Sequence, residues 1–171
     1  MEITRIYTQT MPKTRFIGKK YGDADRVNGS FSAKWGEAFD TGLFGVIENA
    51  TGKENFFEDC EAYIGLMRSK DGEPFQYWIG MFTKENTSVP EGLEYVDFPA
   101  SEIGIGWIYG NEGEIYCHEP DVAQKLMEEG HKIKDDENGA CWFFERYQCP
   151  RYTTHDEKGN AILDIGFFIE G

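Results

Sequence analysis

Positive charge is scarce in this sequence, and the shortage excludes whole classes of partner. The 171 residues include 17 Lys and Arg against 31 Asp and Glu, a formal net charge of −14 at pH 7. A surface this acidic repels phosphate backbones and anionic membranes. We therefore expect no direct nucleic-acid partner and no membrane partner. Most of the acidity is assigned to a solvated face that keeps the chain in solution.

Long apolar runs and a leader peptide are missing as well. No stretch approaches the roughly 18 apolar residues that are needed to span a bilayer. The chain opens with Met-Glu-Ile-Thr, which has neither the basic nor the apolar region of a secretory signal. These absences predict a cytoplasmic protein.

Cysteine and histidine are few, and their spacing does not suit metal or redox chemistry. The four cysteines show no C-x-x-C spacing and are expected to be free thiols, and the three histidines show no ligand spacing. The residues concerned are Cys60, Cys117, Cys141, Cys149, His118, His131 and His155. Phosphate-loop and nucleophile-elbow motifs do not occur, and Gly104–Gly110 lacks the glycine spacing of a dinucleotide loop. The sequence predicts no metal and no cofactor.

Aromatic residues are abundant. They make up 15% of the chain, with 13 Phe, 9 Tyr and 4 Trp. Such side chains line either hydrophobic cores or ligand pockets, and composition alone does not separate the two.

Hydrophobic periodicity predicts two successive β-α-β-β units in one α+β domain spanning residues 1–171. The first unit has a bent or edge strand within 3–21, a helix over 32–47 and strands at 62–69 and 75–83. The second has a strand at 93–109 interrupted by Pro99, a helix from 118 to 130 and strands at 141–152 and 161–169.

Short identities suggest that the two units are internal repeats, roughly 1–86 and 87–171. Ile17-Gly18 matches Ile103-Gly104, and the segment from Ile79 matches the segment from Ile165, both at an offset of 86 residues. Paired units of this kind leave a cleft between them.

The strand that contains Glu145 carries the most informative pattern. Alternation puts Phe143, Glu145 and Tyr147 on one face, and Trp142, Phe144 and Arg146 on the other. A carboxylate among aromatic residues is costly to desolvate unless it is paired. Three readings follow: the carboxylate faces solvent, it meets a basic side chain of the protein, or it awaits a cationic ligand.

Six segments, taken together, resemble the GyrI-like small-molecule-binding domain, also called the AraC-type effector-binding domain. The resemblance rests on their order and spacing and covers nearly the whole chain. The segments are Phe16–Gly18, Phe75–Gly80, Val89–Glu94, Val96–Ala100, Phe144–Tyr147 and Leu163–Phe168.

This resemblance implies SHS2-type repeats that form a curved antiparallel sheet, with two helices on one face and a ligand cleft on the other. It also implies that the Glu of the Glu-x-Tyr segment contacts cationic aromatic drugs, a role that falls to Glu145 with Tyr147 beside it. Many relatives carry a second acid where this chain has Asp164. As further pocket walls we choose aromatic residues on the expected strands, namely Tyr63, Trp78, Trp107 and Phe143.

The family resemblance therefore favours a stand-alone binder of small hydrophobic, cationic aromatic compounds, acting in drug sensing or sequestration. The regulators of this family attach the domain to a DNA-reading helix-turn-helix, and we expect none here because no basic region is present. An alternative is a hydrolase that detoxifies cyclopropane-bearing genotoxins, as some stand-alone members do, with Glu145 as its general acid or base. A second alternative is an inhibitor that acts on a protein partner through its acidic surface.

Overall fold

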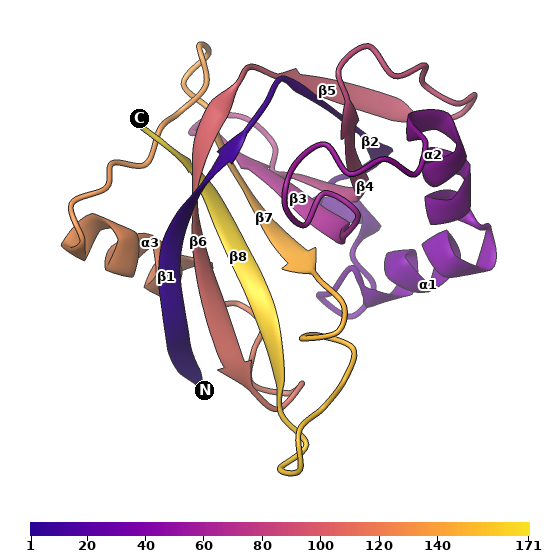
Figure 1. Cartoon of the computed structure of the whole chain (residues 1–171). Coiled ribbons are helices and arrows are strands. Elements are labelled where there is room, and N and C mark those ends of the chain that lie inside the picture. Colours follow the sequence, from indigo (N-terminus) through magenta and orange to yellow (C-terminus); the bar gives the residue numbers. More distant parts are fainter.

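The two expected units join into one continuous sheet in the computed structural model, which describes residues 1–171 (Figure 1). The strands are β1 (Glu2–Met11), β2 (Thr14–Tyr21), β3 (Tyr63–Ser69), β4 (Gln76–Lys84), β5 (Glu94–Phe98), β6 (Ser101–Gly110), β7 (Cys141–Tyr147) and β8 (Ala161–Ile169). The helices are α1 (Ser32–Asp40), α2 (Leu43–Thr51) and α3 (Glu119–Glu128). None of these helices is both long and apolar enough to cross a membrane.

The predicted α+β class and curved antiparallel sheet are confirmed. The strand order is β1-β6-β8-β7-β3-β4-β2-β5, and all pairs are antiparallel. The order is symmetric: replacing each strand by its counterpart in the other half (β1 by β5, β2 by β6, β3 by β7, β4 by β8) gives the same order in reverse. The two halves meet at the central pair β3–β7. Each outermost strand pairs with the other half, since β1 lies against β6 and β5 lies against β2.

Two expected elements are interrupted. The first bent strand is two strands that break at Pro12, because proline offers no N–H to a ladder and β1 and β2 pair with different partners. The expected helix over 32–47 is two helices, α1 and α2, which gives three helices in place of two. They meet at Gly42, whose φ of +69° lies in the left-handed region that glycine adopts at no steric cost.

Helix α3 packs closely on β6 because that strand alternates glycine with large residues. A Cβ at Gly104 would lie 2.6 Å from a methyl carbon of Leu126, and one at Gly106 would lie 2.7 Å from a methyl carbon of Val122. Gly104 and Gly106, which resemble part of a dinucleotide loop, therefore form the surface of β6 against which α3 packs.

The opposite face of the sheet is filled by the largest hydrophobic cluster. Phe98 of the edge strand β5 stacks on Phe168 of β8 at 4.8 Å between ring centroids, so the sheet curls around this cluster. Phe57, in the loop before β3, packs against it. The buried members are Met11, Phe16, Ile64, Leu66, Trp78, Phe82, Phe98, Ile103, Ile105, Trp142, Phe144 and Phe168. The sequence placed the ligand cleft on this face, away from the helices. The structure puts core side chains there instead, because the curl brings distant strands into contact.

A buried ionic cluster closes one end of this core. Arg146 is 2% exposed, and its Nε donates to Asp164 Oδ2 at 2.7 Å, while Asp164 is fully buried. Arg151 also pairs with Asp164, and Asp59 contacts both guanidinium groups. Arg146 also donates to the Tyr7 hydroxyl and to Gln9 Oε1. The charges balance, so these ions are satisfied within the fold.

We predict that Asp164→Asn destabilises the protein by about 3–5 kcal/mol, because Arg146 and Arg151 are then left to share one carboxylate, Asp59, and one buried positive charge is uncompensated. Asp23→Asn, which breaks the exposed Arg26–Asp23 pair, is the matched control and is expected to cost less than about 1 kcal/mol. Urea unfolding of both variants measures the difference. Equal, small losses would show that the cluster contributes no more than a surface pair.

Candidate ligand-binding site

Glu145 lies on the face of β7 that carries the helices. The expected alternation is present, because Phe143 and Tyr147 pack with the helix-side clusters while Phe144 belongs to the core on the other face. Figure 1 shows α1 and α2 on one flank and α3 on the other, with β7 between them. The carboxylate therefore lies where the two halves meet.

Two tyrosines hold the Glu145 carboxylate. The Tyr147 hydroxyl donates to Oε2 at 2.7 Å, and the Tyr77 hydroxyl donates to the same oxygen at 3.2 Å. Tyr77 in turn accepts a hydrogen bond from Trp35 Nε1 at 2.9 Å. Glu145 is only 8% exposed, and no Lys, Arg or His lies within ion-pair distance. It is a buried carboxylate without a cationic partner.

Tyr77 lies on β4, and β3 separates that strand from Glu145 on β7. Tyr77 can reach Glu145 because Gly65, on β3 between them, has no side chain. Gly65 on β3 pairs with Glu145 on β7 and with Ile79 on β4. A Cβ there would lie 2.6 Å from the Tyr77 hydroxyl and 3.1 Å from Glu145 Oε2. Any larger residue would force the two groups apart.

Aromatic rings surround the carboxylate from both halves of the chain. On the first half, Phe31 stacks on Tyr77 at 4.3 Å, and Trp35 of α1 meets the ring of Tyr147 edge-on at 4.8 Å. On the second half, Tyr152 packs edge-on against Tyr147 at 4.7 Å and shares a hydrogen bond with Tyr116. We call this set the aromatic cage: Phe31, Trp35, Tyr77, Tyr116, Tyr147 and Tyr152.

Burial raises the pKa of Glu145 from its usual 4.5 to about 7. The hydroxyls of Tyr147 and Tyr77 oppose this rise, and the negative charge of Glu119, at the start of α3, adds to it. Burial together with the Glu145 charge holds the pKa of Tyr77 and Tyr147 well above the usual range, so both hydroxyls stay protonated and remain donors.

Two of the other residues chosen from the sequence flank the cage without touching Glu145. Tyr63 stacks on Phe44 of α2 at 3.7 Å and donates to Glu48. Phe143 stacks on Phe167 of β8 at 5.3 Å. Both lie on the helix face.

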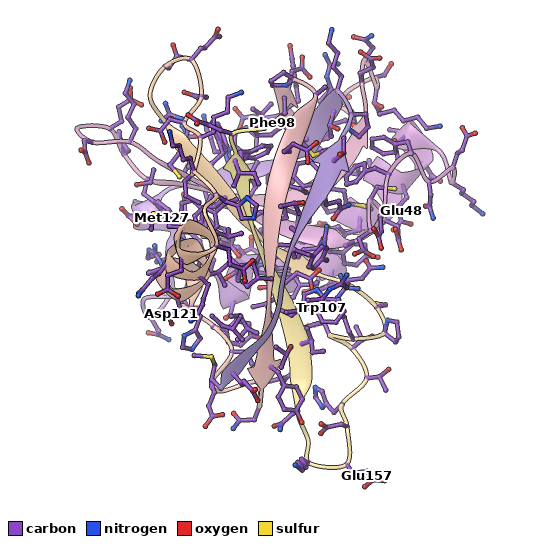
Figure 2. All side chains as sticks on the ribbon, turned by 60° about the vertical axis from the view of Figure 1, so that its left-hand side comes forward. Glu48, Phe98, Trp107, Asp121, Met127 and Glu157 are labelled. Atoms are coloured by element: carbon purple, nitrogen blue, oxygen red, sulfur yellow. The ribbon has the colours of Figure 1, made fainter.

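Trp78, Trp107 and Asp164 lie on the other face of the sheet. Trp78 is a core residue. Trp107 donates to Tyr7 and has the guanidinium of Arg151 over its ring at 4.8 Å, and Figure 2 shows it across β6 from α3. Asp164 is neutralised in the ionic cluster. The structure does not bring these three together with Glu145.

Sequence reasoning missed most of the cage, namely Phe31, Trp35, Tyr77, Tyr116 and Tyr152, together with Glu119. Alternation along β4 puts Tyr77 and Trp78 on opposite faces of the sheet, but it does not say which of them lies on the same face as Glu145. The strand register decides that, because β3 lies between β4 and β7. The remaining residues lie on two helices, α1 and α3, and in three connections, whose paths no local pattern predicts.

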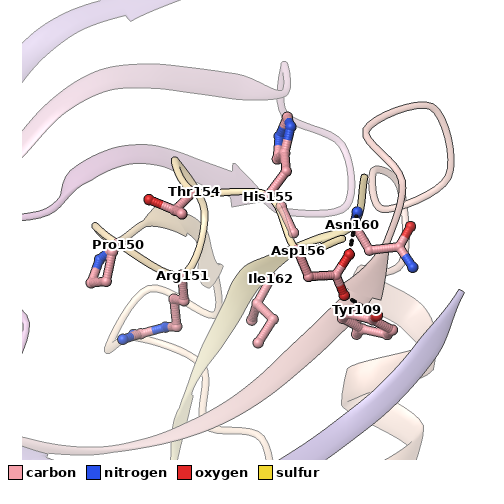
Figure 3. Close-up of a pocket in the computed structure, with 9 residues that line it drawn as sticks. Tyr109, Pro150, Arg151, Thr154, His155, Asp156, Asn160 and Ile162 are labelled. Atoms are coloured by element: carbon pink, nitrogen blue, oxygen red, sulfur yellow. Dashed lines mark hydrogen bonds between the residues drawn. The ribbon is translucent and has the colours of Figure 1, made fainter. Parts of the chain in front are cut away.

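A separate surface depression of about 450 Å³ lies where the connection after β7 approaches the end of β6 (Figure 3). Asp156 accepts hydrogen bonds there from the Tyr109 hydroxyl and from the backbone of Asn160. Its lining includes Arg151 and Ile162 but no member of the aromatic cage. No group of three or more His, Cys, Asp and Glu side chains in the structure could hold a metal ion.

We predict that Glu145→Gln stabilises the protein above neutral pH. The folded state holds the Glu145 proton with a pKa of about 7 against 4.5 normally, so wild type loses stability as pH rises through this window. The glutamine variant should gain on the order of 3 kcal/mol relative to wild type between pH 5 and pH 8. Urea unfolding at both pH values tests this. A difference between the two proteins that does not change with pH would contradict it.

Comparison with solved structures finds the same fold across nearly the whole chain, whereas no family model and no curated protein sequence matches. A putative bacterial transcription regulation protein from Staphylococcus aureus MU50 is 16% identical with a TM-score of 0.62, over 98% of this chain and 99% of that one. SAV2435 bound to tetraphenylphosphonium is 16% identical with a TM-score of 0.58, over 98% and 95%. A hydrolase from Listeria innocua is 8% identical with a TM-score of 0.53, over 99% and 94%. At these identities the chain shares the fold of these proteins.

Proposed function

We propose that the protein binds small hydrophobic aromatic cations at Glu145, in sensing or sequestration of such compounds. The observation that carries this proposal is a carboxylate that is 8% exposed, held by two tyrosine hydroxyls and left without a cation. A buried charge is normally paired. The ionic cluster on the other face of β7 shows that the same fold pairs its other buried charges.

The aromatic cage suits the apolar part of such a ligand. A cation over an aromatic face gains roughly 0.5–2 kcal/mol per contact, more as water is removed. The carboxylate adds an ionic partner that neutral molecules cannot use. Because Trp35 and Tyr147 pack against each other beside Glu145, their rings must move apart to admit a ligand.

A solved neighbour of the same fold supports this choice of ligand class, since SAV2435 was determined bound to tetraphenylphosphonium, a hydrophobic aromatic cation. That complex makes tetraphenylphosphonium a suitable probe. Tetraphenylborate has nearly the same shape with the opposite charge, so the pair isolates the effect of charge.

We predict saturable binding of tetraphenylphosphonium and none of tetraphenylborate, measured by tryptophan quenching and calorimetry. Glu145→Gln should weaken binding at least about 10-fold at pH 8. Because the pKa of Glu145 is about 7, wild-type affinity should rise between pH 5.5 and pH 8, and the affinity of the variant should not.

The control is Asp40→Asn, which removes an exposed acid at the end of α1 and should leave binding unchanged. Equal binding of the cation and the anion would reject a carboxylate-centred site. Equal loss in both variants would show that overall charge, and not Glu145, attracts the cation.

A hydrolase is the second candidate, because a carboxyl group with a pKa of about 7 can both donate and accept a proton near neutral pH. A solved neighbour of the same fold is described as a hydrolase. In this reading Glu145 would assist the addition of water across a strained cyclopropane bond, and Tyr147 would orient the reacting group.

The enzyme reading predicts that a cyclopropane-bearing alkylator gains one water in the presence of the protein, as detected by mass spectrometry. Glu145→Gln should then lower the rate about 10²–10⁴-fold while the alkylator still binds. Recovery of bound compounds unchanged, at the rate of the buffer control, would leave the binder as the function.

A further inference from the structure

We propose that Glu119 of α3 supplies a second carboxylate to the ligand site, so that the preferred ligand is an aromatic cation with N–H donors on both sides, such as an amidinium or guanidinium. This inference rests on the proposed function and deepens it. Asp164, which the family resemblance suggested as a second acid, lies on the other face of the sheet in the ionic cluster.

The packing of α3 directs Glu119 toward the sheet. Val122 and Leu126 are fully buried on β6, and Glu119 lies three residues before Val122 and seven before Leu126, on the same side of the helix. Glu119 is accordingly half-buried, while its helix neighbour Asp121 is exposed.

The segment before α3 is held against the cage. His118 bridges Asp121 at 2.7 Å and the carbonyl of Glu114 at 2.7 Å, which fixes the turn that leads into the helix. The Tyr116 hydroxyl bonds to that of Tyr152 at 2.5 Å. The start of α3 is therefore anchored beside Glu145.

No basic side chain neutralises this pair of acids. The Glu119 side chain lies within hydrogen-bond reach of Glu145, and its charge raises the pKa of both Glu145 and Tyr77. Arg26 lies over the ring of Phe31, but its ion-pair partner is Asp23. Tyr77 and Tyr147 both donate to Glu145 Oε2, so the protein supplies hydroxyl donors but no cation to this carboxylate.

Two neighbouring carboxylates without a basic partner match a planar, forked cation. Amidinium and guanidinium groups present N–H donors in fixed directions and can bond two carboxylates at once. A quaternary ammonium or phosphonium carries the same single charge but has no N–H. Glu119 would therefore favour cations that have N–H donors, whereas the aromatic cage would contact the apolar part of both kinds of cation.

The test compares 2-naphthamidinium with 2-naphthyltrimethylammonium, which share an aromatic body and a single charge, at pH 8 by calorimetry. Wild type should bind the amidinium at least about 10-fold more tightly, the difference expected for a charged hydrogen bond. Glu119→Gln should reduce this preference to less than about threefold with little change for the quaternary cation. Glu129→Gln, which removes an exposed acid just beyond the same helix, should behave as wild type.

Each outcome separates this inference from the proposed function. Equal binding of both probes by wild type, or a preference that survives in Glu119→Gln, would overturn the role of Glu119 and leave the cation site at Glu145 standing. Binding of neither probe by wild type would reject both proposals. Circular dichroism melts confirm that each variant is folded before its affinities are compared.

Discussion

Strand β7 places two buried ionisable side chains next to each other, and the sheet sends them to opposite faces. Arg146 points into the core side, where Asp164 and Asp59 neutralise it. Glu145 points to the helix side, where it meets tyrosine hydroxyls, aromatic rings and the Glu119 carboxyl group but no cation. Carboxylates of the protein thus neutralise the buried charge on one face, whereas the buried carboxylate on the other face has no cationic partner in the protein.

The position of the site follows from how the two halves join. Because β3 and β7 pair at the centre of the sheet, one carboxylate can meet side chains from both halves. The first half contributes Tyr77 and Trp35, and the second contributes Tyr152 and the start of α3. The curl of the sheet fills the opposite face with core residues, which leaves Glu145 and the aromatic cage on the helix side.

Local patterns identified part of the candidate site and misplaced part of it. Glu145 and Tyr147 were found because alternation and the Glu-x-Tyr resemblance point to the same strand. Trp78 was chosen as an aromatic residue on a strand, yet the adjacent Tyr77 is the one that reaches Glu145. Gly65 makes that contact possible, because the Tyr77 hydroxyl occupies the space that a side chain at this position would fill. The sequence alone does not indicate which side chain packs over a glycine.

The sequence by itself determined the order of elements, the break at Pro12, the exposed acidity and the alternation along β7, because each depends on residues close together in the chain. Tertiary structure alone decided which face became the core, which strands flank β7 and which acid approaches Glu145. Those outcomes depend on pairing between strands and helices that are far apart in sequence. For this reason Glu119 and not Asp164 lies near Glu145, although both acids were equally visible in the sequence.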